Sequence, residues 1–272
     1  MKIATVLNAH ENSPVFKDTL ESVRHYLTED VLVVADGKTW SQFKDDDSIP
    51  ALKLEGFYHG KESAPYRNVC LGLMKAWEIW GGSAQWYCYM EYDALVGSRE
   101  VIDHLGLADD IGLWLLGNDH RREEKTMPFL ENFQGKMELH YFLGCCLFFS
   151  AKFMKALSDN DFFERFLNFT NFHGGSISLL DDGGKSHLVY DVSEFLYPTL
   201  AVHYGGEIRE IACWEGDGWR GNYEHYPMRF RPDLIEEPFP QACMMHPLKG
   251  YDNPVRAYHR QRRVLDVGKS VN

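Results

Sequence analysis

The sequence lacks the CxxC spacing of cysteines, and this absence excludes two common cysteine-based motifs. The 272 residues include six cysteines, and no two of them form a CxxC pair. A zinc ribbon and a thioredoxin-type redox motif both need such a pair and are therefore excluded. Most of the cysteines lie in apolar runs, as reduced core cysteines do. They stand at positions 70, 88, 145, 146, 213 and 243.

Long hydrophobic runs are also lacking, which bears on membrane insertion and secretion. No apolar run reaches the ~20 residues that a membrane-spanning helix needs. The opening MKIATVLNAHENS has one lysine and an apolar run too short for a signal peptide. We therefore expect no transmembrane segment and a reduced, cytoplasmic protein.

The sequence has fewer basic than acidic residues. Lys and Arg number 28 against 40 Asp and Glu, which gives a formal net charge of −12. Long-range electrostatics then disfavour nucleic acid and anionic membranes as partners, and an anionic ligand would need a local cation. The only basic cluster, RAYHRQRR at 256–263, is interpreted as a solvated tail rather than a binding patch.

The first half of the chain alternates apolar strands with amphipathic helices. Continuous or alternating apolar segments predict strands, and apolar residues at helical spacing predict helices. The predicted strands are 3–7, 30–37, 51–57, the start of 85–98, and 111–117; the predicted helices are 14–27, 67–80 and 98–106. This alternation indicates parallel βαβ units, and hence an α/β fold whose sheet is covered by helices on both faces.

The second half is less regular. Residues 141–157 predict a strand, a glycine and a helix; 161–172 predict a helix, and a further helix begins near 191. The glycine-rich stretch 173–187 is predicted to be a loop. Residues 212–260, rich in Pro, Trp and Tyr, are predicted to be loops that wrap the core.

Three of the predicted strands end in polar or acidic residues. Asn8 closes the first, Asp36 the second, and Glu91 with Asp93 the fourth. Ligands of open α/β sheets bind beyond the carboxyl ends of the strands, so these residues predict a site there. Glu91 and Asp93 face the same side if the strand persists, and two carboxylates suit Mg²⁺ or Mn²⁺. An acidic turn after a buried strand is the alternative.

The order of these segments resembles that of the GT-A glycosyltransferases, which transfer a sugar from a nucleotide diphosphate. Glu91-Tyr92-Asp93 resembles their DxD-type motif, which ends a buried strand and binds the metal of the donor diphosphate. The resemblance covers roughly residues 1–250. It implies a GT-A, Rossmann-like mixed sheet and a single domain over 1–272, with 212–272 as a C-terminal wrapping segment. It also implies a divalent metal, Mn²⁺ or Mg²⁺.

The same resemblance implies a donor site. TVLNAHENS resembles the first strand and donor loop, VVADG the strand whose acid meets the nucleoside, and YRNVCLGLMKAW the segment whose Arg approaches the nucleotide. The implied nucleotide-binding residues are Asn8, Ala9, His10, Asp36, Arg67 and Asn68. Asp36 can alternatively begin an Asp-Gly turn. Arg67 would stand near a helix N-terminus, where a cation is disfavoured unless an anion such as a diphosphate compensates.

Two later motifs complete the implied site. MMHPLKGYDNP resembles the segment whose His completes the metal site, which makes His246 a third metal ligand and lets Lys249 reach a phosphate. YDVSEFL resembles the acidic motif that supplies the catalytic base in inverting members, which points to Asp191 or Glu194. The structural alternatives are a packed histidine at 246 and a helix-capping box formed by Asp191 and Glu194.

These observations predict a metal-dependent glycosyltransferase. Its donor would be a UDP- or GDP-type sugar, and its acceptor the hydroxyl of a glycan or another molecule. A nucleotidyltransferase ranks lower because NAHENSPVFKD has no glycine for a phosphate loop. A non-catalytic protein that binds carbohydrate or nucleotide sugar, with its aromatic residues as sugar platforms, is the alternative outside the enzymes.

Overall fold

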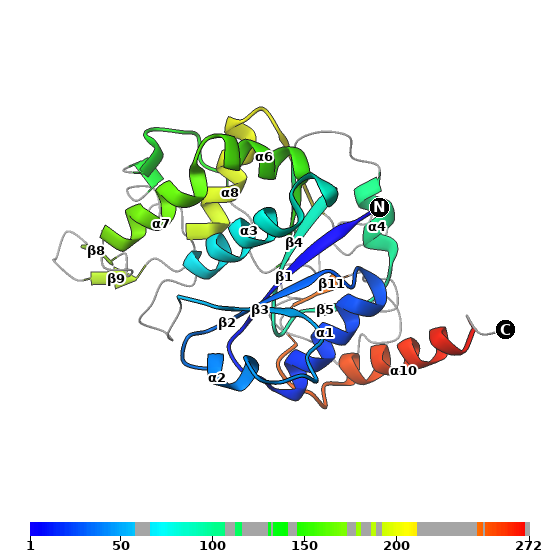
Figure 1. Cartoon of the computed structure of the whole chain (residues 1–272). Helices are drawn as coiled ribbons and strands as arrows, with labels where there is room; N and C mark the ends of the chain where they lie inside the picture. The colour runs from blue at the N-terminus through cyan, green and yellow to red at the C-terminus, as the bar shows by residue number, and fades with distance from the viewer. Residues whose placement is uncertain are drawn as a thin grey trace.

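The protein is described from a computed structural model, shown in Figure 1. The described residues are 1–57, 66–106, 112–115, 130–131, 133–140, 146–172, 178–180, 186–188, 192–210, 244–246 and 248–269. Of the predictions above, Asp191 and most of the segment 212–260 fall outside these ranges.

A seven-stranded mixed sheet forms the centre, with the strand order β10-β6-β7-β4-β1-β2-β3. β4, β1, β2 and β3 run parallel, β10 is parallel to β6, and β7 is antiparallel to both β4 and β6. The strands are β1 Ile3–Ala9, β2 Val31–Ala35, β3 Leu52–Glu55, β4 Trp86–Glu91, β6 Gly112–Leu115, β7 Cys146–Ser150 and β10 Glu207–Glu210. The predicted α/β class, a Rossmann-like mixed sheet, is confirmed.

Helices cover both faces of this sheet (Figure 1). One face carries α3 Tyr66–Trp80, α6 Ala151–Asp159, α7 Phe162–Phe172 and α8 Val192–His203. The other carries α1 Pro14–Tyr26, α2 Trp40–Phe43 and α4 Glu100–Gly106. Alternation along β1 separates the two cores, because Ala4 and Val6 join one cluster while Ile3 and Leu7 join the other.

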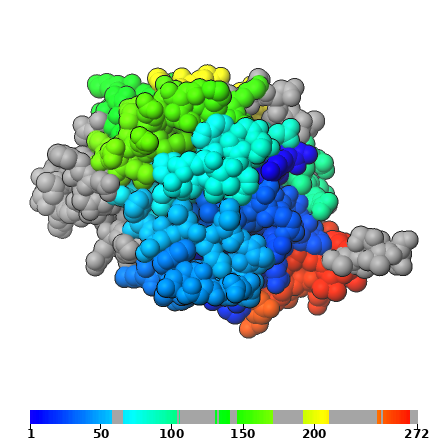
Figure 2. All heavy atoms as spheres, in the orientation of Figure 1, coloured from blue at the N-terminus to red at the C-terminus, as the bar shows by residue number. Residues whose placement is uncertain are grey.

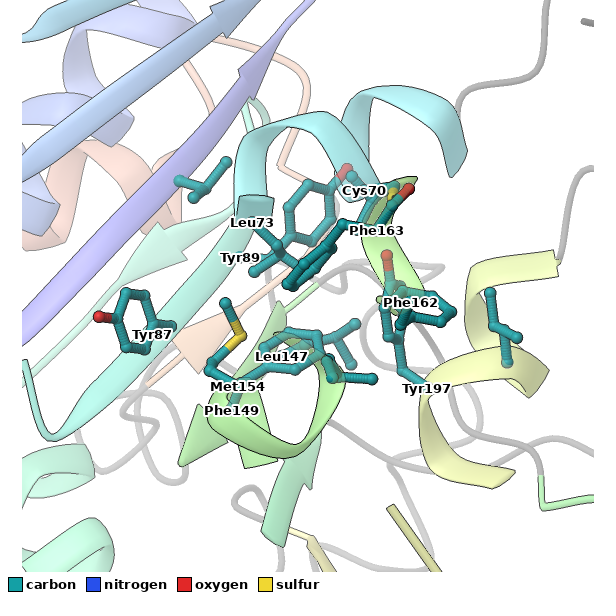
Figure 3. Close-up of a cluster of buried hydrophobic side chains, with 14 of the residues drawn as sticks. Cys70, Leu73, Tyr87, Tyr89, Leu147, Phe149, Met154, Phe162, Phe163 and Tyr197 are labelled. Carbon is teal, nitrogen blue, oxygen red and sulfur yellow. The ribbon is translucent and has the colours of Figure 1, made fainter. Parts of the chain in front are cut away.

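Many of the aromatic residues that the structure describes lie inside the first core. Figure 3 shows Tyr87, Tyr89, Phe149, Phe162 and Tyr197 packed together between the sheet and the covering helices. The rings of Phe149 and Tyr197 meet edge to face with centroids 5.2 Å apart, a favourable geometry for aromatic pairs. These side chains are core residues and cannot serve as sugar-binding platforms on the surface.

Glycine lets α3 approach the sheet closely. A Cβ at Gly72 would stand 2.5 Å from Val6 Cγ1 and 3.0 Å from Val34 Cγ2. A side chain there would force α3 away from β1 and β2. Because α3 runs back across these strands, this packing places its N-terminus at their carboxyl ends.

Two small sheets lie beside the main one. β5 Leu95–Val96 pairs antiparallel with β11 Met244–Met245. β8 Ser178–Leu180 pairs antiparallel with β9 Ser186–Leu188, so the stretch 173–187 contains strand residues and the prediction of a plain loop was wrong. The sequence pattern did not indicate strands there, because each strand has only three residues and glycines flank them.

The C-terminal residues form a long helix, α10 Pro254–Lys269, which lies at the surface beside α1 (Figure 2). The interpretation of 256–263 as a solvated tail was therefore wrong. Arg256 and His259 are fully buried and Arg263 is nearly so. The prediction that residues 212–260 form loops was also wrong for 254–260, which belong to α10. In the described part of the chain, no helix is long and apolar enough to cross a membrane.

Candidate metal and nucleotide site

The carboxyl ends of three parallel strands bring the predicted polar residues to one edge of the sheet. Asn8, near the end of β1, pairs in register with Glu91 on β4 and with Val34 on β2. Asp36 follows β2 directly, and its N–H donates to Ala9 O at 3.0 Å. The sheet therefore places Asn8, Ala9, Asp36 and Glu91 beside one another, as the sequence predicted.

Glu91, Asp93 and His246 form a group that could hold a metal ion, here called the metal group. One ligand atom from each residue lies within 4.8 Å of the others. His246 Nε2 lies 3.1 Å from Glu91 Oε2 and 3.1 Å from Asp93 Oδ1. Asp93 is buried, while Glu91 and His246 are partly exposed, so the group opens toward solvent on one side.

The metal group contains more hydrogen-bond acceptors than hydrogens for them to accept. His246 Nε2 carries at most one hydrogen, yet it stands equally close to two carboxylates. Apart from this shared imidazole, the buried Asp93 Oδ1 has no hydrogen-bond partner among the described residues. Burial would raise the pKa of Asp93, but the hydrogen bond and charge of His246, with the charge of Lys249, lower it. An ionised, under-satisfied oxygen next to a second carboxylate and an imidazole fits a divalent cation.

His246 reaches Asp93 through a local pairing of distant segments. Glu91 and Asp93 flank a tight turn after β4, closed by a bond from Ala94 N–H to Glu91 O at 3.1 Å. β5 follows that turn and pairs with β11, which ends immediately before His246. Leu248 N–H then donates to Asp93 O at 2.8 Å. Main-chain pairing on both sides of His246 thus holds the imidazole over the acidic turn.

His10 lies between Asp36 and Tyr92, the residue between Glu91 and Asp93. Its Nδ1 lies 3.9 Å from Asp36 Oδ2, and its ring meets Tyr92 edge to face at 5.5 Å. The other Asp36 oxygen accepts from Lys38 N–H at 2.8 Å. Burial and the charges of Asp93, Glu11 and Glu91 raise the pKa of Tyr92 to about 12, which keeps its phenol neutral.

Arg67 and Asn68 lie in the first turn of α3, at the carboxyl ends of β2 and β3. Asn68 Oδ1 accepts from Phe57 N–H at 2.6 Å, and a Cβ at Gly56 would stand within 3 Å of both Asn68 side-chain polar atoms. Asn68 is therefore engaged in holding the end of β3. The Arg67 guanidinium lies over the Phe57 ring at 4.7 Å, and burial lowers its pKa.

The remaining predicted residues lie at the margins of this geometry. Lys249 is exposed and close enough to affect the pKa of Asp93. Glu194 is half-buried in the first turn of α8. Asp191, its rival as catalytic base, lies outside the described residues.

Two residues that support the acidic turn of the metal group are absent from the sequence-based prediction: Thr19 on α1 and Arg256 on α10. Asp18, also on α1, binds Arg256. Thr19 Oγ1 lies 2.7 Å from Tyr92 O and 2.6 Å from Ala94 O, the carbonyls of the acidic turn. Arg256 Nη2 donates to the same Ala94 O at 3.0 Å. One available signal was the helix start at Asn253-Pro254, followed by Val255, Arg256, His259 and Arg263 at helical spacing.

No protein-family model matches the chain, and no curated protein matches it in sequence. Its structure is similar to that of a glycosyltransferase involved in glycosylation of the major capsid of PBCV-1, with 10% identity over 97% of this chain and 100% of the other, at a TM-score of 0.49. It is also similar to an active-site mutant of LgtC, with 10% identity over 95% of each chain and a TM-score of 0.47.

A third similar structure is mannose-1-phosphate geranyltransferase from Thermus thermophilus. It shares 14% identity over 77% of this chain and 73% of that one, with a TM-score of 0.45. Identities of 10–14% at TM-scores below 0.5 describe a likeness in the overall course of the chain.

Proposed function

We propose that this chain is a metal-dependent glycosyltransferase that moves a sugar from a nucleotide diphosphate to a hydroxyl acceptor. The metal group at the carboxyl edge of the sheet is the observation that carries the proposal. Two carboxylates and an imidazole converge there from segments 155 residues apart, between Glu91 and His246. A merely structural acidic turn does not need a third ligand brought from so far along the chain.

Glu91, Asp93 and His246 would hold Mn²⁺ or Mg²⁺. When bound, the ion supplies a Lewis acid that stabilises the negative charge of a departing diphosphate. Lys249, exposed at the rim, would add a point charge toward a phosphate. With a net charge of −12, the chain needs these local cations to attract an anionic donor.

The nucleoside end of the donor would lie along the same strand edge, against Asn8, Ala9, His10 and Asp36. Asn8 Oδ1 is buried without a hydrogen-bond partner in the described part of the chain, which leaves it able to accept from a ligand. Arg67 would contribute charge from the N-terminus of α3. The engagement of Asn68 with Phe57 N–H favours a supporting role for Asn68 over direct contact with the nucleotide.

Deprotonation of the acceptor hydroxyl would fall to Asp191 or Glu194 if the sugar is transferred with inversion. Glu194 stands in the first turn of α8, where the helix dipole stabilises a carboxylate. A base needs this ionised form to take a proton from the attacking hydroxyl. Transfer with retention needs no such base.

Thermal shift with nucleoside diphosphates tests the proposal. UDP or GDP should stabilise the wild type far more with Mn²⁺ than with EDTA, by about 2.7 kcal/mol at ~100 times the dissociation constant. Asp93→Asn should remove the metal-dependent part, whereas Asp103→Asn, an exposed acid on α4, should retain it. Equal shifts with and without metal would refute the metal role. Sugar-induced stabilisation without metal or nucleotide would favour a binding protein.

A further inference from the structure

Arg256 occupies the junction between α10, α1 and the two segments that carry the metal group. Its side chain is fully buried. Nε donates to Leu248 O at 2.7 Å and Nη1 to Asp18 Oδ2 at 2.7 Å. Nη2 donates to Thr19 Oγ1 at 3.1 Å and to Ala94 O at 3.0 Å. One planar group thus serves four acceptors in three separate parts of the chain.

Two of these acceptors belong to the segments that supply the metal ligands. Ala94 directly follows Asp93, and Leu248 lies two residues after His246. Between the acidic turn and the segment after His246, the described main chain makes a direct bond from Leu248 N–H to Asp93 O. Arg256 adds a second connection, because it binds both carbonyls at once.

We infer that Arg256 is a positioning residue that fixes the distance of His246 from Asp93 and Glu91. It acts through Ala94 O and Leu248 O and does not itself contact a ligand. This role rests on the proposed metal function and extends it to α10, which the sequence suggested was a tail. On this inference, α10 helps to set the geometry of the metal group although it supplies none of its three residues.

The geometry requires arginine and not merely a positive charge. The guanidinium presents five N–H donors in a rigid plane, so it can reach Leu248 O, Asp18 and Ala94 O in fixed directions. A lysine ammonium would retain the charge facing Asp18 but could not span the carbonyls on both sides. Groups that orient metal ligands in this way typically change metal affinity about 10- to 100-fold when they are replaced.

Arg263 provides a matched control. It also lies on α10, is also largely buried and also donates to Asp18, through Nη2 to Oδ1. None of its described hydrogen bonds reaches the segments of the metal group. Arg263→Lys therefore perturbs the same carboxylate and the same helix without touching Ala94 or Leu248.

The test is titration of the whole chain with Mn²⁺ alone, by calorimetry, at a temperature where circular dichroism shows every variant folded. Arg256→Lys should weaken Mn²⁺ binding roughly 10- to 100-fold. Arg263→Lys should stay within about threefold of the wild type, because its contacts leave the ligand carbonyls in place. Wild-type affinity in Arg256→Lys, or equal weakening in both variants, would overturn the positioning role.

Asp93→Asn separates this inference from the proposed function. If Asp93→Asn abolishes Mn²⁺ binding and Arg256→Lys does not weaken it, only the positioning role fails. If Mn²⁺ does not bind the wild type, or binds Asp93→Asn equally well, the metal group itself fails and the positioning role fails with it. Should Arg256→Lys not fold, Arg256→Gln takes its place, because a single amide group cannot bind Leu248 O and Ala94 O at once. Unchanged Mn²⁺ affinity in that variant would also overturn the role.

Discussion

Two clusters of charged side chains meet at the acidic turn after β4, and their charge balance is opposite. The metal group sets two carboxylates against one imidazole nitrogen. The second group, here called the arginine cluster, sets the single carboxylate of Asp18 against Arg256, Arg260 and Arg263. Asp93 and Asp18 are similarly buried, at 3% and 2% exposure. Burial alone therefore does not distinguish a binding site from a structural ion pair.

The number of donors around each carboxylate makes the distinction. Both Asp18 oxygens accept from guanidinium groups, which leaves that carboxylate fully satisfied. Asp93 shares one imidazole hydrogen with Glu91 and, among the residues that the structure describes, keeps an oxygen without a further partner. A carboxylate with surplus donors holds the fold together, whereas carboxylates with too few donors can still bind a cation.

Removal of Asp18 is expected to have the largest effect on the stability of the protein. Asp18→Ala should lower the free energy of unfolding by about 3–5 kcal/mol, because it leaves the buried guanidinium of Arg256 without its counter-charge. Urea denaturation of the metal-free protein measures this loss. Glu21→Ala, at an exposed position on the same helix, should stay within about 0.5 kcal/mol of the wild type. A loss below about 1 kcal/mol for Asp18→Ala would contradict the structural role of the arginine cluster.

The next largest effect is a pH dependence of stability that comes from His259, a fully buried residue of α10. Burial and the charges of Arg262 and Arg263 lower its pKa from 6.5 to about 4. Below pH 6.5 the unfolded chain binds a proton that the folded chain does not, so stability is complete above that pH and falls toward pH 4. The loss should total about 3 kcal/mol at ~1.4 kcal/mol per pKa unit.

His259→Phe isolates this contribution, since phenylalanine does not titrate. Urea denaturation at about pH 7 and about pH 4.5 should show a smaller loss of stability in the variant than in the wild type. Acidic groups that titrate over the same range contribute to both proteins and cancel in the difference. Identical pH profiles would show that His259 does not titrate with a lowered pKa.

Much of the main sheet and its polar edge was predictable, because local patterns determine them. The apolar runs that became β1, β2 and β4 predicted strands, and parallel strands bring their carboxyl ends together. The convergence of Asn8, Asp36 and Glu91 at one edge could therefore be predicted without information from distant segments. The antiparallel course of β7 had no such local signal, since strand direction depends on a connection whose path the pattern does not contain.

The arginine cluster was not predicted because its partner carboxylate is remote in sequence. RAYHRQRR has the composition of a solvated segment, and it contains no acidic residue. Asp18 lies 238 residues before Arg256 and has the appearance of an ordinary surface acid on an amphipathic helix. Only the packing of α10 on α1 shows that Asp18 pairs with these arginines.

The smallest expected effect completes the comparison at Asp93. Asp93→Asn should change the free energy of unfolding of the metal-free protein by about 1 kcal/mol or less. The amide oxygen can still accept from His246, and the main-chain bond from Leu248 N–H to Asp93 O does not depend on the side chain. Urea denaturation in EDTA at about pH 7, beside Asp18→Ala, measures the contrast between two equally buried aspartates. A loss of about 3 kcal/mol or more would make Asp93 a structural anchor like Asp18, and the count of donors would no longer separate the two groups.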